Sequence, residues 1–283
     1  MKKFLFTAAI LLIFLVGLSV LLYPYVADYI NSLHQSRVVT QYNNDLQKLS
    51  EQDFTDLLTA AQVYNEELPG KPNRYVLSDD ELSEYDSLLN PFGNGIMGTL
   101  IIDEIGVRLP IYHGTSEGVL QIGAGHLEGT SLPVGGPGTH TVITGHRGLP
   151  SSTLLTKMDR LVIGDTFELN VLNQTLTYKI DQILVVLPDE MEALAIEDGK
   201  DYCTLVTCTP YGINTHRMLV RGVRVANAEA PAQSAPQRTP VSADADAVNN
   251  MVIAALVFTP VFIIVAVYMG VNLRKINGRR KKQ

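Results

Sequence analysis

The sequence predicts a mainly β domain, closed as a barrel or stacked as a sandwich, with helices before it and an apolar segment near each end of the chain. Three observations carry this prediction. Short β-like runs separated by turn residues fill the region from Gly98 to Ala226. Apolar residues recur every three or four positions over residues 39–64. Two stretches of about 20 residues lack any charge, which is the length of a membrane-crossing helix.

The two apolar stretches predict membrane spans. Phe4 to Leu22 follows two lysines, and Met251 to Val271 precedes six basic residues in the last ten positions. Lys and Arg concentrate on the cytoplasmic side of spans. We therefore expect a cell-membrane protein with two spans, both termini cytoplasmic and the middle of the chain extracellular. The first stretch also fits a cleaved signal peptide, which would leave the middle of the chain outside as well.

The region after the first span is predicted to be helical, with a break near Ser50. Ser78 and Glu81 form a capping box that should begin a further short helix. A loop at residues 90–95 follows, rich in proline and glycine but carrying an aromatic residue. The predicted organisation is a signal-anchor span (1–23), a membrane-proximal helical region (24–89), a loop (90–95), a β domain (96–226), a flexible linker (227–249), a second span (250–273) and a basic cytoplasmic tail (274–283).

The β domain should contain seven or eight strands. Asn173-Gln174 is the predicted hairpin turn between two of them. Gly123–Gly138 is predicted to be a long glycine-rich loop, of a length that is usually either functional or disordered. The predicted strands are Thr99–Ile102, Leu109–Tyr112, Thr141–Thr144, Phe167–Leu172, Leu176–Ile180, Ile183–Leu187, Tyr202–Cys208 and Met218–Val225.

Charge separates along the chain and excludes one class of partner. All 29 acidic residues lie between the two apolar stretches, together with only 14 of the 22 Lys and Arg. A region with a net charge of −15 lacks the basic surface that nucleic-acid phosphates require. It reads instead as a well-solvated extracellular surface.

The two cysteines do not form a disulfide pattern. Cys203 and Cys208 are an odd number of residues apart in one predicted strand, so their side chains should point to opposite faces. Neither cysteine has partners at metal-ligand spacing, so no metal and no cofactor is expected. Cys203 fits a core residue. Cys208 ends its strand beside Thr209-Pro210, where it is either a core residue or an exposed nucleophile.

A cysteine nucleophile needs a base and a donor for the oxyanion. Among six histidines, His146 also follows a strand, in TGHRG, although other histidines remain candidates from the residues alone. Arg217 opens the strand after that of Cys208, so antiparallel pairing would return its guanidinium to the thiol. A salt-bridged arginine at the sheet rim is the alternative reading.

Three separated motifs resemble one family. TLVTCTPYGINTHRMLVRG resembles the TLxTC signature of the sortases, the cysteine transpeptidases of Gram-positive bacteria, and TGHRG resembles their histidine motif. GAGHLEGTSLPVGG is similar to a stretch of class C, the pilus-building sortases. The resemblance covers roughly residues 90–225 and includes the two-span layout.

The resemblance implies an eight-stranded barrel with its active site at one end. It implies that Cys208 is the nucleophile, His146 the acid/base and Arg217 the donor to the oxyanion or substrate, with Thr207 lining the substrate site.

The family also places an Asp-Pro-aromatic lid over the groove. The matching residues here are Asn90, Pro91 and Phe92, so Phe92 would cover Cys208 and Asn90 would face Arg217. Asparagine in place of aspartate turns a charge-assisted hydrogen bond into a neutral one of about half the strength, which implies a looser lid.

The implied reaction is cleavage of an LPxTG-like sorting signal between Thr and Gly, followed by transfer of the acyl group to a lysine amine. The implied partners are pilin precursors with C-terminal sorting signals, the acceptor lysine of the next pilin and the cell membrane. A wall-anchoring sortase and a thiol protease are the alternative enzymes. A non-enzymatic, membrane-tethered β domain that binds a surface partner is the alternative of another class.

Overall fold

The computed structural model describes residues 2–71 and 73–227. They fall into two compact units, one ending at Val26 and the other beginning at Ala27. The first helix, α1 (Lys2–Leu46), contains Pro24, and its part from Leu5 onward is long and apolar enough to cross a membrane. The predicted second span, the tail and nearly all of the predicted linker lie outside the described residues.

Two further helices precede the sheet, and each starts at a capping box. Ser50 begins α2 (Glu51–Glu67) by exchanging hydrogen bonds with Asp53, which confirms the predicted break. Ser78 begins α3 (Asp79–Ser87) in the same way with Glu81, as predicted. The helix α4 (Glu117–Ile122) lies between two strands, and short 3-10 helices cover Leu68–Gly70, Asp103–Ile105, Thr156–Arg160 and Glu192–Leu194.

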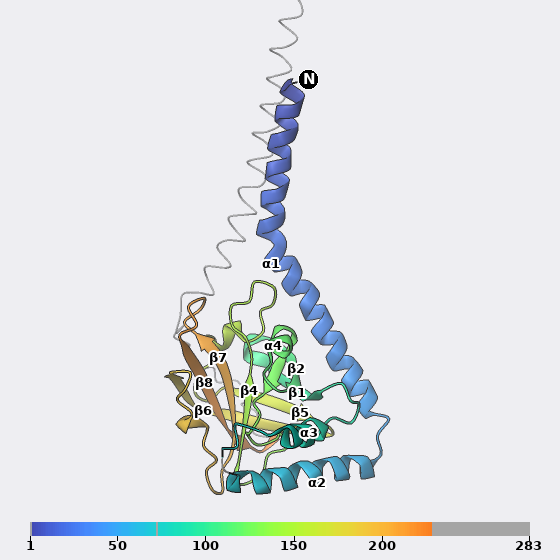
Figure 1. Cartoon of the computed structure of the whole chain (residues 1–283), viewed down its shortest axis with the longest axis vertical. Helices are drawn as coiled ribbons and strands as arrows, with labels where there is room; N and C mark the ends of the chain where they lie inside the picture. The colour runs from blue at the N-terminus through green and yellow to red at the C-terminus, as the bar shows by residue number, and fades with distance from the viewer. Residues whose placement is uncertain (1, 72, 228–283) are drawn as a thin grey trace, which may run out of the picture. The chain divides into compact units, whose positions relative to one another are not determined.

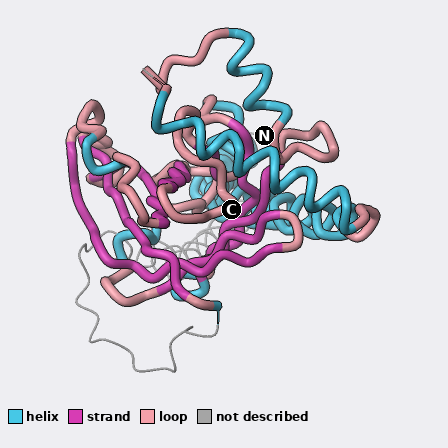
Figure 2. Tube along the Cα trace, turned by 90° about the horizontal axis from the view of Figure 1, so that it is seen from below, coloured by secondary structure: helices cyan, strands magenta, loops and turns pink. Residues whose placement is uncertain are grey.

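Eight strands close into a barrel, as the family resemblance implied. The order around the barrel is β1-β2-β3-β4-β7-β8-β6-β5, and the helices lie outside this ring of strands (Figures 1 and 2). The strands are β1 (Ile96–Ile102), β2 (Val107–His113), β3 (Ala124–His126), β4 (Thr139–Thr144), β5 (Thr166–Val171), β6 (Gln174–Val186), β7 (Asp201–Thr209) and β8 (His216–Val225).

The strand predictions need three corrections. The strand β3 lies inside the predicted glycine-rich loop, where small residues give no apolar alternation. The runs Leu176–Ile180 and Ile183–Leu187 are one strand, β6, because a bulge between Ile180 and Gln182 shifts the register without ending the pairing. Val171 pairs with Gln174, so the hairpin turn is Leu172-Asn173, one position earlier than predicted.

The core fills the barrel and extends under α2 and α3. Leu100, Ile111, Ile143, Leu205 and Val220 are fully buried, one from each of five strands. The helices α2 and α3 add aromatic side chains to the same core cluster. Closure of the sheet gives every strand a hydrogen-bonded neighbour on each side.

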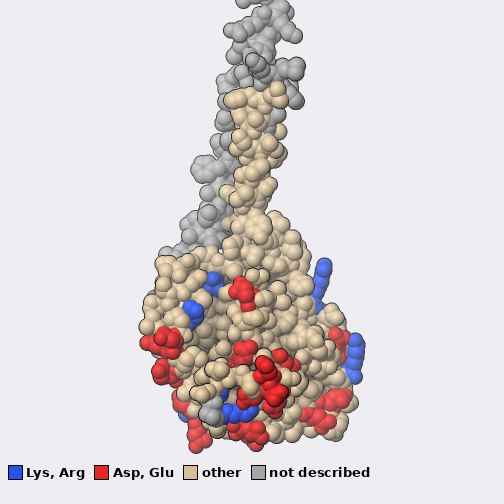
Figure 3. All heavy atoms as spheres, viewed as in Figure 1, with Lys and Arg blue, Asp and Glu red and all other residues tan. Residues whose placement is uncertain are grey.

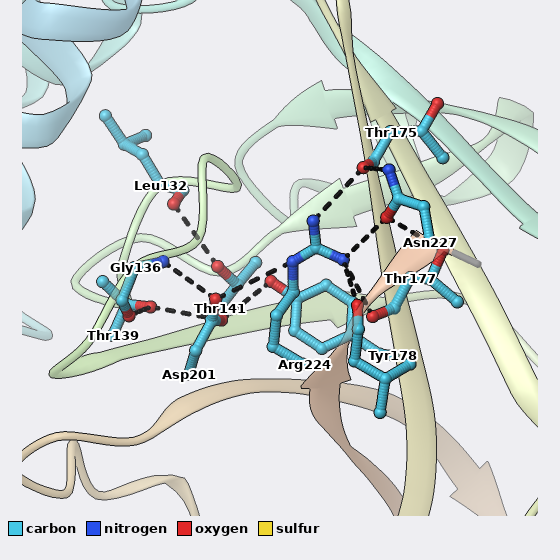
Figure 4. Close-up of polar contacts among 11 residues, drawn as sticks. Leu132, Gly136, Thr139, Thr141, Thr175, Thr177, Tyr178, Asp201, Arg224 and Asn227 are labelled. Atoms are coloured by element: carbon cyan, nitrogen blue, oxygen red, sulfur yellow. Dashed lines mark hydrogen bonds and ion pairs between the residues drawn. The ribbon is translucent and has the colours of Figure 1, made fainter. Parts of the chain in front are cut away.

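A polar network fastens the glycine-rich loop to the start of β7. The Asp201 carboxylate accepts hydrogen bonds from the Gly136 N–H (2.9 Å) and the Tyr178 hydroxyl (3.0 Å), and Arg224 Nε lies 4.0 Å away (Figure 4). Burial raises the pKa of Asp201, and these bonds oppose that rise. On the face shown in Figure 3, acidic side chains outnumber basic ones, as expected from the charge of this region.

Candidate active site

The two cysteines lie on the same strand in opposite environments. Cys203 is fully buried, and desolvation raises the pKa of its thiol well above the ordinary value. Residues 202–207 of β7 are all buried, Cys208 is partly exposed, and Thr209 is buried again. Both thiols are free. The odd spacing therefore separates an inert core thiol from a reachable one, as predicted.

Arg217 is brought to Cys208 by strand pairing. The two residues are directly opposite in the antiparallel β7–β8 ladder, so their side chains lie on the same face of the sheet. Arg217 Nη1 donates to two main-chain carbonyls, those of Asn214 (3.3 Å) and His216 (3.1 Å). None of the ion pairs among the described residues includes Arg217, so the salt-bridge reading is not supported.

His146 follows β4, the other neighbour of β7. The Gly145 N–H donates to the Val206 carbonyl at 3.0 Å and so extends the parallel β4–β7 pairing by one residue. The His146 carbonyl in turn accepts from the Leu155 N–H at 3.2 Å. A Cβ atom at position 145 would lie 2.7 Å from Leu155 Cδ1, so only glycine lets this segment pack so closely. The backbone of His146 is thus held from both sides.

Two other histidines of the barrel have structural roles. His126 is fully buried between the Tyr85 hydroxyl and the Ser131 carbonyl, and burial lowers its pKa to about 4. His140 is buried between the Ala195 carbonyl and the Thr204 hydroxyl, and desolvation lowers its pKa too. Their ring nitrogens are occupied by these partners. Among the residues that the structure describes, His146 is the histidine that lines a cleft together with Cys208, so it remains the predicted acid/base.

One cleft of about 300 Å³ contains all three candidate residues. Cys208, His146 and Arg217 line it together with Thr207, whose hydroxyl donates to the Gly145 carbonyl at 2.7 Å. The rest of the lining is largely apolar: Leu120, Leu127, Val186, Leu187, Pro188, Met191, Leu194, Val206 and Leu219. The site thus pairs a small group of reactive side chains with an apolar trough, the usual composition of a ligand cleft.

A carboxylate accompanies His146. Glu117 Oε2 lies 3.4 Å from His146 Nε2, and Glu117 Oε1 accepts from the Gln121 amide at 3.1 Å. Among the described residues, Nε2 of His146 has no hydrogen-bond partner, so the contact with Glu117 is an electrostatic one that strengthens when the imidazole is protonated. Glu117 is two-thirds exposed, and solvent screens its effect.

The residues of the expected lid make contacts of their own. Asn90 accepts from the Gly95 N–H and donates to the Asp86 carbonyl, which uses its side chain to shape its own turn. Phe92 packs edge-on against Tyr42 with ring centroids 6.1 Å apart. Asn90, Pro91 and Phe92 are not among the residues that line the cleft, and the lid over Cys208 stays a prediction. The aromatic partner of Phe92 is thus Tyr42 on α1, a residue distant in sequence.

Three contributors to the site were missed from the sequence: Arg147, Asp159 and Glu117. Arg147 forms a buried ion pair with Asp159 at 2.8 Å and also donates to Thr209, the neighbour of Cys208. Its place beside His146 in TGHRG was a usable signal. Neither Asp159 nor Glu117 had a signal in the sequence, because each lies on a separate segment that comes close to the site only in the folded chain.

The arrangement suits acyl transfer through cysteine. A thiol, an imidazole and a guanidinium share one cleft, which supplies a nucleophile, a proton carrier and an anion-stabilising donor. No group of His, Cys, Asp and Glu with the form of a metal site occurs within residues 2–71 and 73–227.

Comparison with known proteins places this fold and site in a family. Residues 100–225 match the model of the sortase domain. The crystal structure of sortase C1 from Streptococcus agalactiae is 46% identical, with a TM-score of 0.66, and the match covers 68% of this chain and 99% of that one. Sortase C from Streptococcus pneumoniae is 39% identical with a TM-score of 0.60, covering 72% of this chain and 100% of that one.

Two other relatives extend the comparison. Sortase C from Clostridium perfringens, solved with the C-terminal cell wall sorting motif, is 40% identical with a TM-score of 0.59, covering 68% of this chain and 99% of that one. Sortase A of Streptococcus agalactiae serotype III (strain NEM316) is 29% identical over 117 residues, which is 40% of this chain. The match spans about half (47%) of that curated relative. With a matching domain model and class C structures aligned over nearly their whole length, this chain belongs to the sortase family.

Proposed function

We propose that the chain is a membrane-anchored cysteine transpeptidase of the pilus-building kind, which joins pilin subunits. The observation that carries the proposal is the meeting of Cys208, His146 and Arg217 in one apolar cleft of a sortase barrel. Two similar structures add support. The pneumococcal one concerns pilin substrate specificity, and the clostridial one contains a cell wall sorting motif.

In the first half-reaction, the Cys208 sulfur attacks the threonine carbonyl of an LPxTG-like sorting signal. The Thr–Gly C–N bond breaks, a thioester forms, and the leaving amine takes a proton from His146. The Arg217 guanidinium lies on the same sheet face as the thiol, where it can donate to the oxyanion or to the peptide that carries it. Thr207 lines this end of the cleft.

In the second half-reaction, a lysine amine of the next pilin attacks the thioester. The amine gives its proton to His146, an isopeptide bond forms, and the Cys208 thiolate leaves. A thiol suits both halves because it is a strong nucleophile and a good leaving group. No cofactor takes part in this scheme.

The apolar trough fits the leucine and proline of such a signal. Val186, Leu187 and Pro188 from the end of β6 form part of this wall, and Leu120 and Leu127 also contribute. Glu190 accepts from the Leu187 N–H at 2.9 Å and thereby braces the loop after β6. Signal side chains can be buried here while the scissile bond reaches the thiol.

Membrane anchoring supports the same assignment. The early part of α1 is long and apolar enough to span a membrane. Pilin precursors are themselves held in the membrane before processing, and sharing a surface raises the effective concentration of both reactants. We place the barrel outside the cell, with the basic flanks at both termini in the cytoplasm.

An incubation with two substrates tests the function. The full chain in detergent is mixed with a sorting-signal peptide, and its intact mass is measured with and without a lysine-bearing pilin acceptor. We expect a hydroxylamine-sensitive adduct on Cys208 that disappears when the acceptor is added, together with an isopeptide-linked product.

The other outcomes identify the alternatives. An adduct resolved only by water indicates a thiol protease, and one resolved only by a wall-peptide amine indicates a wall-anchoring sortase. The absence of any adduct would favour a binding domain and contradict the proposed transpeptidase.

A further inference from the structure

The residues on either side of Cys208 and His146 are tied together. On the N-terminal side, the Thr207 hydroxyl donates to the Gly145 carbonyl at 2.7 Å. Regular pairing between β4 and β7 ends just before this point, at Thr144 and Val206. The side-chain bond therefore continues the connection between the two strands beyond the end of the ladder.

A second tie lies on the C-terminal side of the same two residues. Arg147 Nη1 donates to the Thr209 hydroxyl at 3.1 Å. Because strand residues alternate, Thr209 points to the face opposite Cys208, so this bond is made behind the thiol and not within the cleft. Arg147 does not line the cleft, so it is not placed to touch a substrate there.

The Arg147 side chain is itself held by a buried ion pair. Arg147 Nη2 donates to Asp159 Oδ2 at 2.8 Å, and the two side chains are only 3% and 4% exposed. Asp159 lies in the 3-10 helix Thr156–Arg160. The Thr156 hydroxyl also accepts from the Gly148 N–H at 3.1 Å, so the same segment holds the loop after His146 at two points.

A buried ion pair is weak evidence for stability, because its desolvation penalty often cancels its attraction. Well-packed apolar residues of similar volume commonly do as well. A directional role explains this pair better, since one guanidinium reaches Asp159 and Thr209 with different nitrogens. The planar fork of arginine allows this geometry and the ammonium of lysine does not.

We propose that Arg147, fixed by Asp159, is a positioning residue that sets the placement of His146 relative to Cys208 through its bond to Thr209. Thr207 provides the matching tie on the other side. The role of Arg147 in catalysis rests on the proposed transpeptidase function, whereas its effect on the thiol–imidazole geometry does not.

Thr209→Val and Thr209→Ser form the matched pair of variants. Valine keeps the branched shape and the Arg147–Asp159 pair but removes the acceptor oxygen, and serine keeps the oxygen. We expect Thr209→Val to lower the single-turnover rate of Cys208 acylation by about 10- to 100-fold, the scale of a small misplacement of reacting groups. Thr209→Ser should stay within about threefold of the parent chain on the same scale.

The pH dependence of Cys208 alkylation by iodoacetamide needs no substrate and reports the contact between thiol and imidazole directly. Glu117 also faces this imidazole, so it is left unchanged in every variant. We expect the alkylation profile of Thr209→Val to shift from that of the parent chain towards that of His146→Ala. A profile equal to the parent's would overturn the proposal even if the chain processed no sorting signal.

A double variant separates positioning from stability. Arg147→Met with Asp159→Leu replaces the ion pair by apolar groups of similar size, and its melting temperature should stay near that of the parent chain. We expect its alkylation profile to resemble that of Thr209→Val. A folded double variant with the parental profile and acylation rate would show that the pair only fills space.

Discussion

The polar side chains at the two ends of β7 differ in how many hydrogen-bond and ion-pair partners they have. At the first end, the Asp201 carboxylate has accumulated partners: the Gly136 N–H, the Tyr178 and Thr139 hydroxyls, and Arg224 within 4.0 Å. Such a network fixes the glycine-rich loop and has little capacity left for a ligand. Its saturation identifies it as structural.

At the last end of β7, the reactive groups have few partners of their own. His146 Nε2 has no hydrogen bond within the described residues, and Arg217 spends one nitrogen on two carbonyls. The backbone around them is nonetheless held tightly by neighbours. The candidate site is therefore marked by polar atoms without partners, carried on a backbone that neighbouring segments hold in place.

Replacing each of the two cysteines by alanine should give the largest difference between a site residue and a core residue. Cys208→Ala should abolish acyl transfer with no change in folding, because no other reachable thiol exists among the described residues. Cys203→Ala should keep the activity of the folded enzyme and lower the free energy of unfolding by about 1–2 kcal/mol through loss of a buried side chain. Isopeptide product and urea unfolding measure the two effects, and activity in Cys208→Ala would refute the assignment.

The arginines of β8 offer the next contrast. Arg217→Ala should lower the rate of acylation by about 10²–10³-fold, the usual loss for one oxyanion donor. Arg224→Ala removes bonds to the Thr177 and Val225 carbonyls and should reduce stability while sparing the rate per folded molecule. Single-turnover acylation rates and melting curves are measured for both variants. The rate should fall mainly in Arg217→Ala, and the melting temperature mainly in Arg224→Ala. Equal losses of acylation rate in the two variants would contradict the specific role of Arg217 as a donor to the oxyanion.

How much of this site the sequence could predict depends on distance along the chain. Strand alternation was enough to separate Cys203 from Cys208, and motif resemblance placed His146 and Arg217. The ion pair of Arg147 could not be predicted, because Asp159 reaches it only after a separate loop has folded back.

The same limit explains the errors in the fold. The strand β3 consists of small residues that have no apolar alternation, and its pairing with β2 and β4 decides its conformation. A motif match predicts Phe92 over the cleft, whereas the ring contact that the structure shows for it is with Tyr42, fifty residues away in sequence. Local sequence pattern was enough to predict the long strands, whereas the conformation of β3 depends on contacts with distant parts of the chain.

The buried and reactive histidines can be compared through pH. Burial lowers the pKa of His126 to about 4, so the folded protein favours the neutral ring. The unfolded chain takes up this proton below its ordinary pKa of about 6.5. The stability that His126 contributes is therefore fully present above that pH and is lost as pH falls from 6.5 towards 4, by about 3 kcal/mol in total.

Denaturant unfolding at pH 7 and pH 4.5 measures this loss. A His126→Gln variant should show a shallower decline with falling pH than the parent chain, since its ring proton is no longer involved. Parallel declines in the two proteins would remove His126 as the source.

Glu117→Gln should give the smallest effect. The carboxylate lies 3.4 Å from His146 but is mostly exposed, and exposed ion pairs contribute little. We expect less than about a fivefold change in acyl-transfer rate, reduced further at high salt. A rate loss near that of Arg217→Ala would instead make Glu117 a full member of the site.

Because side chains alternate along β7, the reaction depends on whether the spacing between positions 203 and 208 is odd or even. Inserting or deleting one residue between positions 203 and 208 would turn the thiol towards the barrel interior and a threonine towards the cleft, although every side chain type would remain. Homologous or engineered chains can therefore change the identity of these intervening residues far more freely than their number.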